Sequence, residues 1–330
     1  MFALPVPVAN CLAALRQGGF EAYPVGGCVR DLLLGRVPGD WDITTSARPE
    51  QVMTLFDKTV PTGLPHGTVT VLLDGQSFEV TTFRADVGYS DGRHPDAVVF
   101  GDSLTDDLAR RDFTVNAMAL GADGGVVDPF GGREDLQAKR IRAVGDPTVR
   151  FTEDALRMFR AVRFSAQLDF QLEDGTRAAL IALAPRARYV SGERIKVEVE
   201  KTLLSSRPEL AARFLQWGLL SAPQAPSPGD LRPVFQGVSP EQGPRWRAFC
   251  QATGFDIASL PTERRLRAAV LHPEREAVRE LALPASELMA LGFDGPALGQ
   301  LQVHLARHIL AHPQDNTPEA LAALARAFRP

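Results

Sequence analysis

One stretch near the N-terminus, Val25–Ser46, constrains the fold and chemistry of this chain more than any other feature. It reads VGGCVRDLLLGRVPGDWDITTS. Gly26 and Gly27 interrupt an apolar run just before a predicted helix over Cys28–Leu34, and backbone without side chains lets a ligand approach closely. The N-terminus of such a helix offers free N–H groups to an anion, and Arg30 lies on its first turn. The stretch therefore predicts a phosphate-binding site.

Two carboxylates, Asp40 and Asp42, follow this helix in a short β-prone segment. Alternate residues of a strand share a face, so the two carboxylates point the same way and Trp41 points the other. Paired carboxylates beside phosphate favour Mg²⁺, which prefers oxygen ligands and keeps phosphate oxygens in its shell. An isolated Asp-x-Asp pattern is more often a surface turn, so the prediction depends on the glycines upstream.

The composition predicts a protein with a sizeable core and more than one unit, since 45% of the 330 residues are hydrophobic. The three cysteines are scattered, and neither a cationic leader nor a run of membrane-spanning length is present, so we expect a cytoplasmic protein without membrane contact. The net charge of −4 argues against a nucleic-acid partner. However, basic residues outnumber acidic ones by eight to five over residues 130–165 and by eight to four over residues 177–213, which suits a phosphate-rich ligand.

The pattern GGxVRDxLLG followed by DxDI resembles motif A of the class II tRNA nucleotidyltransferases. This family contains the bacterial and eukaryotic CCA-adding enzymes and also poly(A) polymerases. Four further segments resemble motifs B to E in family order: Arg110–Leu120, Asp128–Leu136, Phe151–Phe164 and Val190–Lys201. The resemblance implies an α+β fold, with a polymerase-β-type nucleotidyltransferase head and an all-helical neck, body and tail. We expect these parts at residues 1–135, 136–220 and 221–330.

The resemblance also implies an activity: template-independent addition of nucleotides to the 3′ end of tRNA. The substrates would be CTP and ATP, pyrophosphate would be released, and Mg²⁺ ions on Asp40 and Asp42 would assist the transfer. Glu79, on a predicted strand over Phe78–Arg84, would be the third catalytic carboxylate, although from the sequence alone it is an ordinary exposed glutamate. The tRNA would contact the helical body and tail through its acceptor and TΨC arms.

The residues expected to bind the nucleotide carry groups that fit its phosphates or its sugar. Gly26, Gly27, Arg30 and Arg111 are assigned to the triphosphate, because guanidinium groups suit phosphate oxygens. Asp112 and Asn116 are four residues apart, which places them on one face of a predicted helix where they could bind ribose hydroxyls.

The segment Phe151–Phe164 predicts a helix with Asp154 in its first turn, and Arg157, Arg160 and Arg163 continue the same row. By itself, Asp154 with Arg157 is an ordinary ion pair. The resemblance implies that this pair replaces a template. A carboxylate accepts from the exocyclic amine of adenine or cytosine while a guanidinium donates to the ring nitrogen, and guanine and uracil mismatch both groups. Arg160 and Arg163 would orient the pair and meet the triphosphate.

Several alternatives stay open. One is an enzyme that adds only the terminal A and works with a separate CC-adding enzyme. A poly(A) polymerase is less favoured, because those relatives carry an arginine-rich segment where this chain has Gly63–Val69. A tRNA-binding protein without catalysis is disfavoured by the intact Asp40 and Asp42. The polar segment Phe83–Leu104, which contains Asp91–Pro95, matches a full-length family loop and argues against a CC-only enzyme.

Two further segments are expected to have no chemical role. The motif E segment, Val190–Lys201, is interpreted as a helix that braces the neck. His304, His308 and His312 recur every fourth residue and could form a metal-binding face, but no cysteine lies nearby and a helix-ending proline follows His312. Surface histidines are the simpler interpretation.

Overall fold

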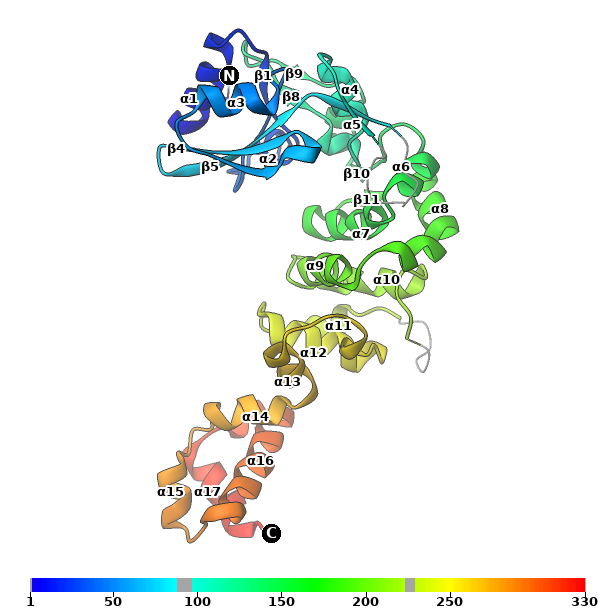
Figure 1. Cartoon of the computed structure of the whole chain (residues 1–330). Coiled ribbons are helices and arrows are strands. Elements are labelled where there is room, and N and C mark those ends of the chain that lie inside the picture. The colour runs from blue at the N-terminus through cyan, green and yellow to red at the C-terminus, as the bar shows by residue number, and fades with distance from the viewer. Residues whose placement is uncertain (1, 88–96, 223–228, 330) are drawn as a thin grey trace.

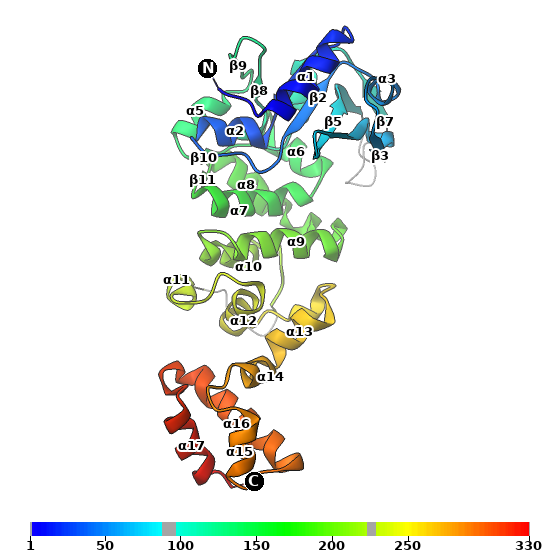
Figure 2. The ribbon, with the colours of Figure 1, turned by 90° about the vertical axis from the view of Figure 1, so that its left-hand side faces the viewer.

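The computed structural model describes residues 2–87, 97–222 and 229–329. The molecule is elongated and curved, with a mixed α/β head at one end and helices at the other (Figure 1). Figure 2, turned by 90°, shows the helical parts stacked below the head. The expected α+β fold, with a head followed by an all-helical remainder, is confirmed.

The main sheet of the head has seven strands among the described residues, in the order β3-β4-β5-β2-β1-β8-β9. Their bounds are β1 Ala22–Val25, β2 Asp42–Thr45, β3 Thr59–Gly63, β4 Thr68–Leu73, β5 Gln76–Thr82, β8 Ala119–Leu120 and β9 Val126–Val127. Only β2 and β5 pair in parallel; the other neighbouring strands of this sheet are antiparallel. This parallel pair sets Asp42 beside Glu79, which is how the sheet brings distant carboxylates together.

The hairpin β4–β5 shows how local sequence specifies this sheet. Asp74 and Gly75 form its two-residue turn, with φ of +51° and +76°. Such turns need positive φ at both positions, which Asp-Gly supplies. In β4, Val69 and Val71 are buried and alternate with more exposed neighbours, so the strand is apolar on one face.

Helices of the head cover this sheet and lead into the next unit. Their bounds are α1 Val6–Gln17, α2 Gly27–Leu33, α3 Pro49–Leu55, α4 Leu104–Ala109 and α5 Gly132–Gln137. Helices α1 and α3 contact each other and pack on β1, β4 and β5 (Figure 1). Part of the segment expected to be a loop, Phe83–Leu104, is a two-stranded antiparallel ribbon of β6 Arg84–Val87 and β7 Ala97–Phe100. Residues Asp91–Pro95, on which the full-length-loop prediction depends, lie outside the described residues.

The remainder is helical apart from a small parallel pair, β10 Arg140–Ile141 and β11 Gln171–Leu172. The neck and body helices are α6 Pro147–Glu153, α7 Leu156–Leu168, α8 Asp174–Leu183, α9 Gly192–Leu203, α10 Ala212–Gln216, α11 Arg232–Phe235, α12 Gln242–Thr253 and α13 Arg264–Leu271. The last four are α14 Pro273–Ala277, α15 Ala285–Ala290, α16 Gly295–Ala311 and α17 Pro318–Ala327. These last four helices share a hydrophobic core separate from the core of the head and neck.

None of the helices in the described ranges has both the length and the apolar character needed to cross a membrane.

Candidate active site

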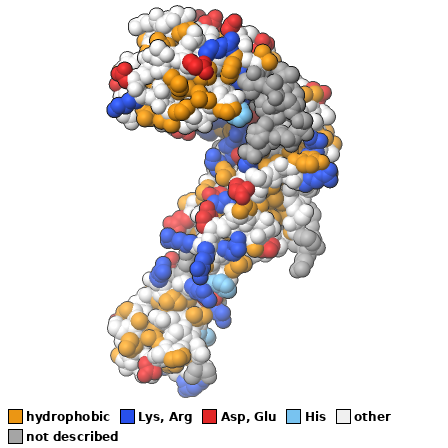
Figure 3. Space-filling model, in the orientation of Figure 1, with side chains coloured by type: hydrophobic (Ala, Val, Ile, Leu, Met, Phe, Trp, Pro, Cys, Tyr) orange, Lys and Arg blue, Asp and Glu red, His pale blue; other side chains and the backbone are white. Residues whose placement is uncertain are grey.

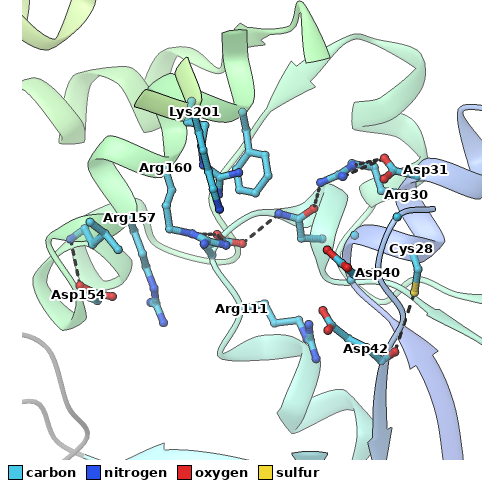
Figure 4. A pocket seen from close by; sticks show the side chains of 18 of the residues that line it. Cys28, Arg30, Asp31, Asp40, Asp42, Arg111, Asp154, Arg157, Arg160 and Lys201 are labelled. Atoms are coloured by element: carbon cyan, nitrogen blue, oxygen red, sulfur yellow. Dashed lines mark hydrogen bonds and ion pairs between the residues drawn. The ribbon is translucent and has the colours of Figure 1, made fainter. Parts of the chain in front are cut away.

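A cleft of about 620 Å³ separates the sheet of the head from the first neck helices. Figure 4 shows Asp40 and Asp42 on one side of it, Asp154, Arg157 and Arg160 on the other, and Arg111 directed toward the acidic pair. The sequence-predicted residues that line the cleft are Gly26, Gly27, Arg30, Asp40, Asp42, Arg111, Asp112, Asn116, Asp154, Arg157, Arg160 and Arg163. Residues as far apart in the chain as Gly26 and Arg163 therefore face one space.

The acidic wall begins at the first residue of β2. Asp42 is exposed, Trp41 before it is buried, and Asp40 is exposed again, so the expected alternation holds although β2 begins only at Asp42. Glu79 pairs with Asp42 across the strands and is exposed. It does not line the cleft itself but lies beside the acidic pair.

The electrostatics of this wall favour a bound cation. Removal from water raises the pKa of Asp42, and the charge of Arg111 opposes this rise. The neighbouring charges of Glu79 and Asp40 raise the pKa further. A cation would relieve this repulsion. Cys28 lies beneath, and burial together with the charge of Asp42 raises the pKa of its thiol to about 11, so it stays protonated and inert.

The donor set fits Mg²⁺ better than a metal bound by protein alone. Among the described residues no group of three or more His, Cys, Asp or Glu side chains is placed to hold an ion. Asp40 and Asp42 together supply hard carboxylate oxygens and leave the other positions for water and substrate. Mg²⁺ is usually held in this way, by one or two carboxylates with phosphate oxygens and water.

The glycine turn, Gly26-Gly27, lies in the cleft beside Arg111. Gly26 has φ +81°, which only glycine adopts readily, and a Cβ there would lie 3.0 Å from Nη1 of Arg111. Helix α2 begins at Gly27, and Arg30 on it donates to Oδ1 of Asn116 at 2.8 Å and to Asp31 at 2.9 Å. Gly26 and Arg30 therefore both line the cleft, and Arg30 is held in place there by Asn116 and Asp31.

Asp107, which the sequence analysis missed, holds the two arginines of motif B. It is fully buried in α4 and accepts from Arg110 at 2.6 Å, from Arg111 at 3.1 Å and from the Thr44 hydroxyl at 3.1 Å. Burial opposes ionisation, but Arg111 and Arg110 outweigh it and lower the pKa of Asp107. The signal was present in the sequence as i,i+3 and i,i+4 spacing to these arginines.

Asp112 links the head to helix α7. Its Oδ2 accepts from Nε of Arg160 at 2.6 Å, and its Oδ1 accepts from the Asn116 amide at 3.3 Å. Residues 114–116 form a short 3-10 turn, so the expected helical face is wrong, yet Asp112 and Asn116 are still neighbours. Burial opposes ionisation of Asp112, but the charge of Arg160 outweighs it and lowers the pKa below its usual range.

This pKa shift predicts how stability depends on pH. A carboxylate with a lowered folded-state pKa stabilises the fold above its ordinary pKa of about 4, and this contribution is lost as the pH falls through the lowered value. We expect urea unfolding to show Asp112→Asn less stable than the parent at pH 7, with the difference shrinking toward pH 3. A difference that stays constant over this range would contradict the assignment.

Helix α7 begins later than the sequence predicted. Asp154 is not in a helical first turn: it lies at a break between α6 and α7 with extended backbone, φ −140° and ψ 106°. It does not pair with Arg157. Its Oδ2 instead accepts from Nη2 of Arg194 at 2.8 Å. The prediction that Asp154 shares one helix with Arg157, Arg160 and Arg163 is therefore wrong. The three arginines alone lie on α7.

Each of these arginines has a separate partner. Arg157 contacts Glu153 at 2.5 Å and donates to the Arg110 carbonyl at 2.9 Å, which orients it across the cleft from the acidic strand. Arg160 bonds to Asp112, and Arg163 donates to Glu198 of α9 at 2.5 Å. The pairs to Asp112 and Glu198 fasten α7 to the head and to α9.

Helix α9 contributes to the cleft, contrary to the expectation of a purely bracing helix. Arg194 and Lys201 both line the cleft, and Glu198 between them holds Arg163. The signal that could have found them is their helical spacing, since residues 194, 198 and 201 share one face.

Of the three histidines, His304 and His308 lie on α16 and His312 follows its last residue, with the ring centroids of His308 and His312 4.8 Å apart. His308 bonds to Asp315 at 2.7 Å, and His304 lies against the Phe328 ring. His304 and His312 are exposed and His308 is half-buried.

Two family models match the chain. Residues 22–142 match the poly A polymerase head domain, and residues 169–220 match the probable RNA and SrmB-binding site of polymerase A. The first match contains the cleft residues of the head and the second contains those of α9, while the cleft residues of α7 lie between the two matches.

Known proteins similar to this chain are named CCA-adding enzymes. The Leuconostoc mesenteroides subsp. mesenteroides protein is 47% identical over 74% of this chain and 62% of its own length. The Geobacillus thermodenitrificans protein is 52% identical over 60% of this chain and 50% of its own length. The matched part thus spans about half to three fifths of these curated relatives.

A solved structure matches over nearly the whole chain. The Bacillus stearothermophilus CCA-adding enzyme in complex with CTP is 32% identical with a TM-score of 0.66, and the match covers 98% of each chain. With the glycine turn, the acidic strand and the arginines in one cleft, this chain belongs to the tRNA nucleotidyltransferase/poly(A) polymerase family, which includes the CCA-adding enzymes.

Proposed function

We propose that this protein adds nucleotides to the 3′ end of tRNA, building CCA or its end from CTP and ATP without a nucleic-acid template. The observation that carries the proposal is a single cleft with paired carboxylates on one wall and a carboxylate with guanidinium groups on the other. The first wall fits phosphoryl chemistry, and the second fits an adenine or cytosine edge. Relatives named CCA-adding enzymes support it.

The catalytic wall would comprise Asp40 and Asp42, with Glu79 beside them. They would hold Mg²⁺, which when bound supplies positive charge to the triphosphate and lowers the pKa of the attacking hydroxyl. The tRNA 3′ oxygen bonds to the α-phosphorus of the nucleotide while the bond to the β-phosphate oxygen breaks, and pyrophosphate leaves. Arg30 and Arg111 lie at the glycine turn where they can bind the phosphates.

The nucleotide-reading wall would comprise Asp154 and Arg157. Asp154 can accept from the exocyclic amine of cytosine or adenine. Among the described residues, three of the five N–H groups of Arg157 are engaged, two by Glu153 and the Arg150 carbonyl and one by the Arg110 carbonyl, which leaves donors for a ring nitrogen. Uracil and guanine present the opposite pattern, and each buried mismatch costs about 1–3 kcal/mol.

A tRNA partner fits the basic helical surface. Figure 3 shows Lys and Arg side chains gathered over the middle of one face, between the head and the last helices. Such a surface suits a phosphate backbone. We propose that residues 1–135 act as the catalytic head, 136–220 as the nucleotide-reading neck, and 221–330 as the part that binds the acceptor and TΨC arms.

Three tRNA substrates test the function. The purified chain, with Mg²⁺ and labelled CTP and ATP, is given tRNAs that end at the discriminator, at C and at CC. We expect extension of all three to CCA. Extension of the CC end alone would indicate an A-adding enzyme that needs a separate CC-adding partner, and extension of none would contradict nucleotidyl transfer to tRNA.

A further inference from the structure

Asp154 lacks the support that a helix would give its side chain. It lies between α6 and α7 in extended backbone, and its side chain accepts one local hydrogen bond from the described residues, from the Leu156 amide at 3.0 Å. A carboxylate that must meet one edge of a base needs a fixed direction, because a small displacement of a positioned group weakens recognition. The support for Asp154 must come from elsewhere in the fold.

Arg194 supplies that support from α9, 40 residues along the chain. Its Nη2 donates to Oδ2 of Asp154 at 2.8 Å, and its Nη1 lies 3.4 Å from Oδ1. Two near-parallel contacts from a planar guanidinium fix both the position and the plane of a carboxylate. Both side chains are largely enclosed, at 25% and 18% exposure, and both line the cleft.

The contacts leave one acceptor position open. A carboxylate has about four lone-pair sites, two on each oxygen. Oδ1 is engaged by Leu156 and Arg194, while Oδ2 is engaged by Arg194 alone among the described residues. The remaining site on Oδ2 matches the single N–H that an exocyclic amine donates along its base-pairing edge.

We propose that Arg194 is a positioning residue that sets nucleotide choice by holding the Asp154 carboxylate toward the base. The inference rests on the proposed function, because it concerns the same nucleotide-reading wall. Arg194 acts through Asp154 and need not touch the nucleotide. The neck helix α9 thereby takes part in selecting the nucleotide.

The test measures kcat/KM for each of the four nucleotides on a tRNA that ends in CC or at the discriminator. Arg194→Ala is expected to lose about tenfold of the preference for ATP and CTP over GTP and UTP. Arg194→Lys keeps the charge but not the paired contacts, so it recovers only part of the preference. Arg177→Ala, which removes an exposed arginine paired with Asp174 outside the cleft, is the matched control and keeps the preference.

A double-mutant cycle separates positioning from general destabilisation. In an Asp154→Ala background, Arg194→Ala should change the preference less than about twofold, because the group it positions is gone. If the effects of the two substitutions on the nucleotide preference multiply independently, the inference is overturned. It is also overturned if Arg194→Ala folds and keeps the parent preference. If Arg194→Ala does not fold, Arg194→Lys decides by the same cycle. Failure of the parent protein to add C or A at all would instead overturn the proposed function.

Discussion

Asp42→Asn is expected to reduce nucleotide addition at least about a thousandfold while tRNA binding stays unchanged. Asp42 starts the strand that faces the cleft, and removal from water together with the charges of Glu79 and Asp40 raises its pKa against the opposing charge of Arg111. A bound cation would stabilise its charged form. Loss of several kcal/mol of metal-derived stabilisation gives this effect, since about 1.4 kcal/mol corresponds to tenfold in rate. Single-turnover incorporation of labelled ATP into tRNA ending in CC measures it.

Asp57→Asn is the control for this prediction. Asp57 is an exposed carboxylate of the same head and lies outside the cleft, so its variant keeps normal rates. Chelation of divalent ions should abolish the parent activity, and added Mg²⁺ should restore it. Normal turnover by Asp42→Asn would remove the metal role from this residue, whereas weakened tRNA binding would point to a structural role.

Asp107→Ala is expected to lower the free energy of unfolding by about 3–5 kcal/mol, because removal of one partner of a buried ion pair leaves the opposite charges uncompensated. Asp107 is fully buried and bonds to Arg110, Arg111 and Thr44, so the variant loses contacts to the two arginines that follow α4 and to strand β2. Arg111 also loses its fixed direction toward the acidic wall. Urea unfolding and ATP incorporation measure the two effects.

The neighbouring Asp106→Ala provides a matched control. Asp106 is exposed on the same helix, so its removal should change stability by no more than about 0.5 kcal/mol. Equal destabilisation by the two variants would show that the helix end, and not the buried pairs, carries the effect. A stable Asp107→Ala with full activity would contradict the role of this residue as the anchor of the arginines.

The parts of the candidate site that the sequence predicted correctly depend on local rules. The Gly26-Gly27 turn has positive φ at its first residue, and strand alternation exposes Asp40 and Asp42. These features follow from backbone geometry over a few residues. The family resemblance then supplied the order of the units, and the fold that it implied is confirmed.

The errors occurred where partners are far apart in the chain. A helical period fits Phe151–Phe164, yet the chain breaks at Asp154 because that carboxylate bonds to the Leu156 amide and to Arg194 on another helix. Helical spacing alone predicted an ion pair with Arg157 instead. The spacing of Asp107 to Arg110 and Arg111 is visible in the sequence, but its burial and its bond to Thr44, 63 residues away, are set by the tertiary structure.

The sequence by itself determined the family, the order of head and helical parts, and the chemical character of the two walls of the cleft. Only the tertiary structure decided which acid pairs with which arginine and that α9 faces the cleft. The physical reason is that hydrogen bonds and ion pairs depend on ångström-scale distances between elements. Spacing along the chain sets which face a side chain lies on, but packing of α7 against α9 and the head sets what it meets there.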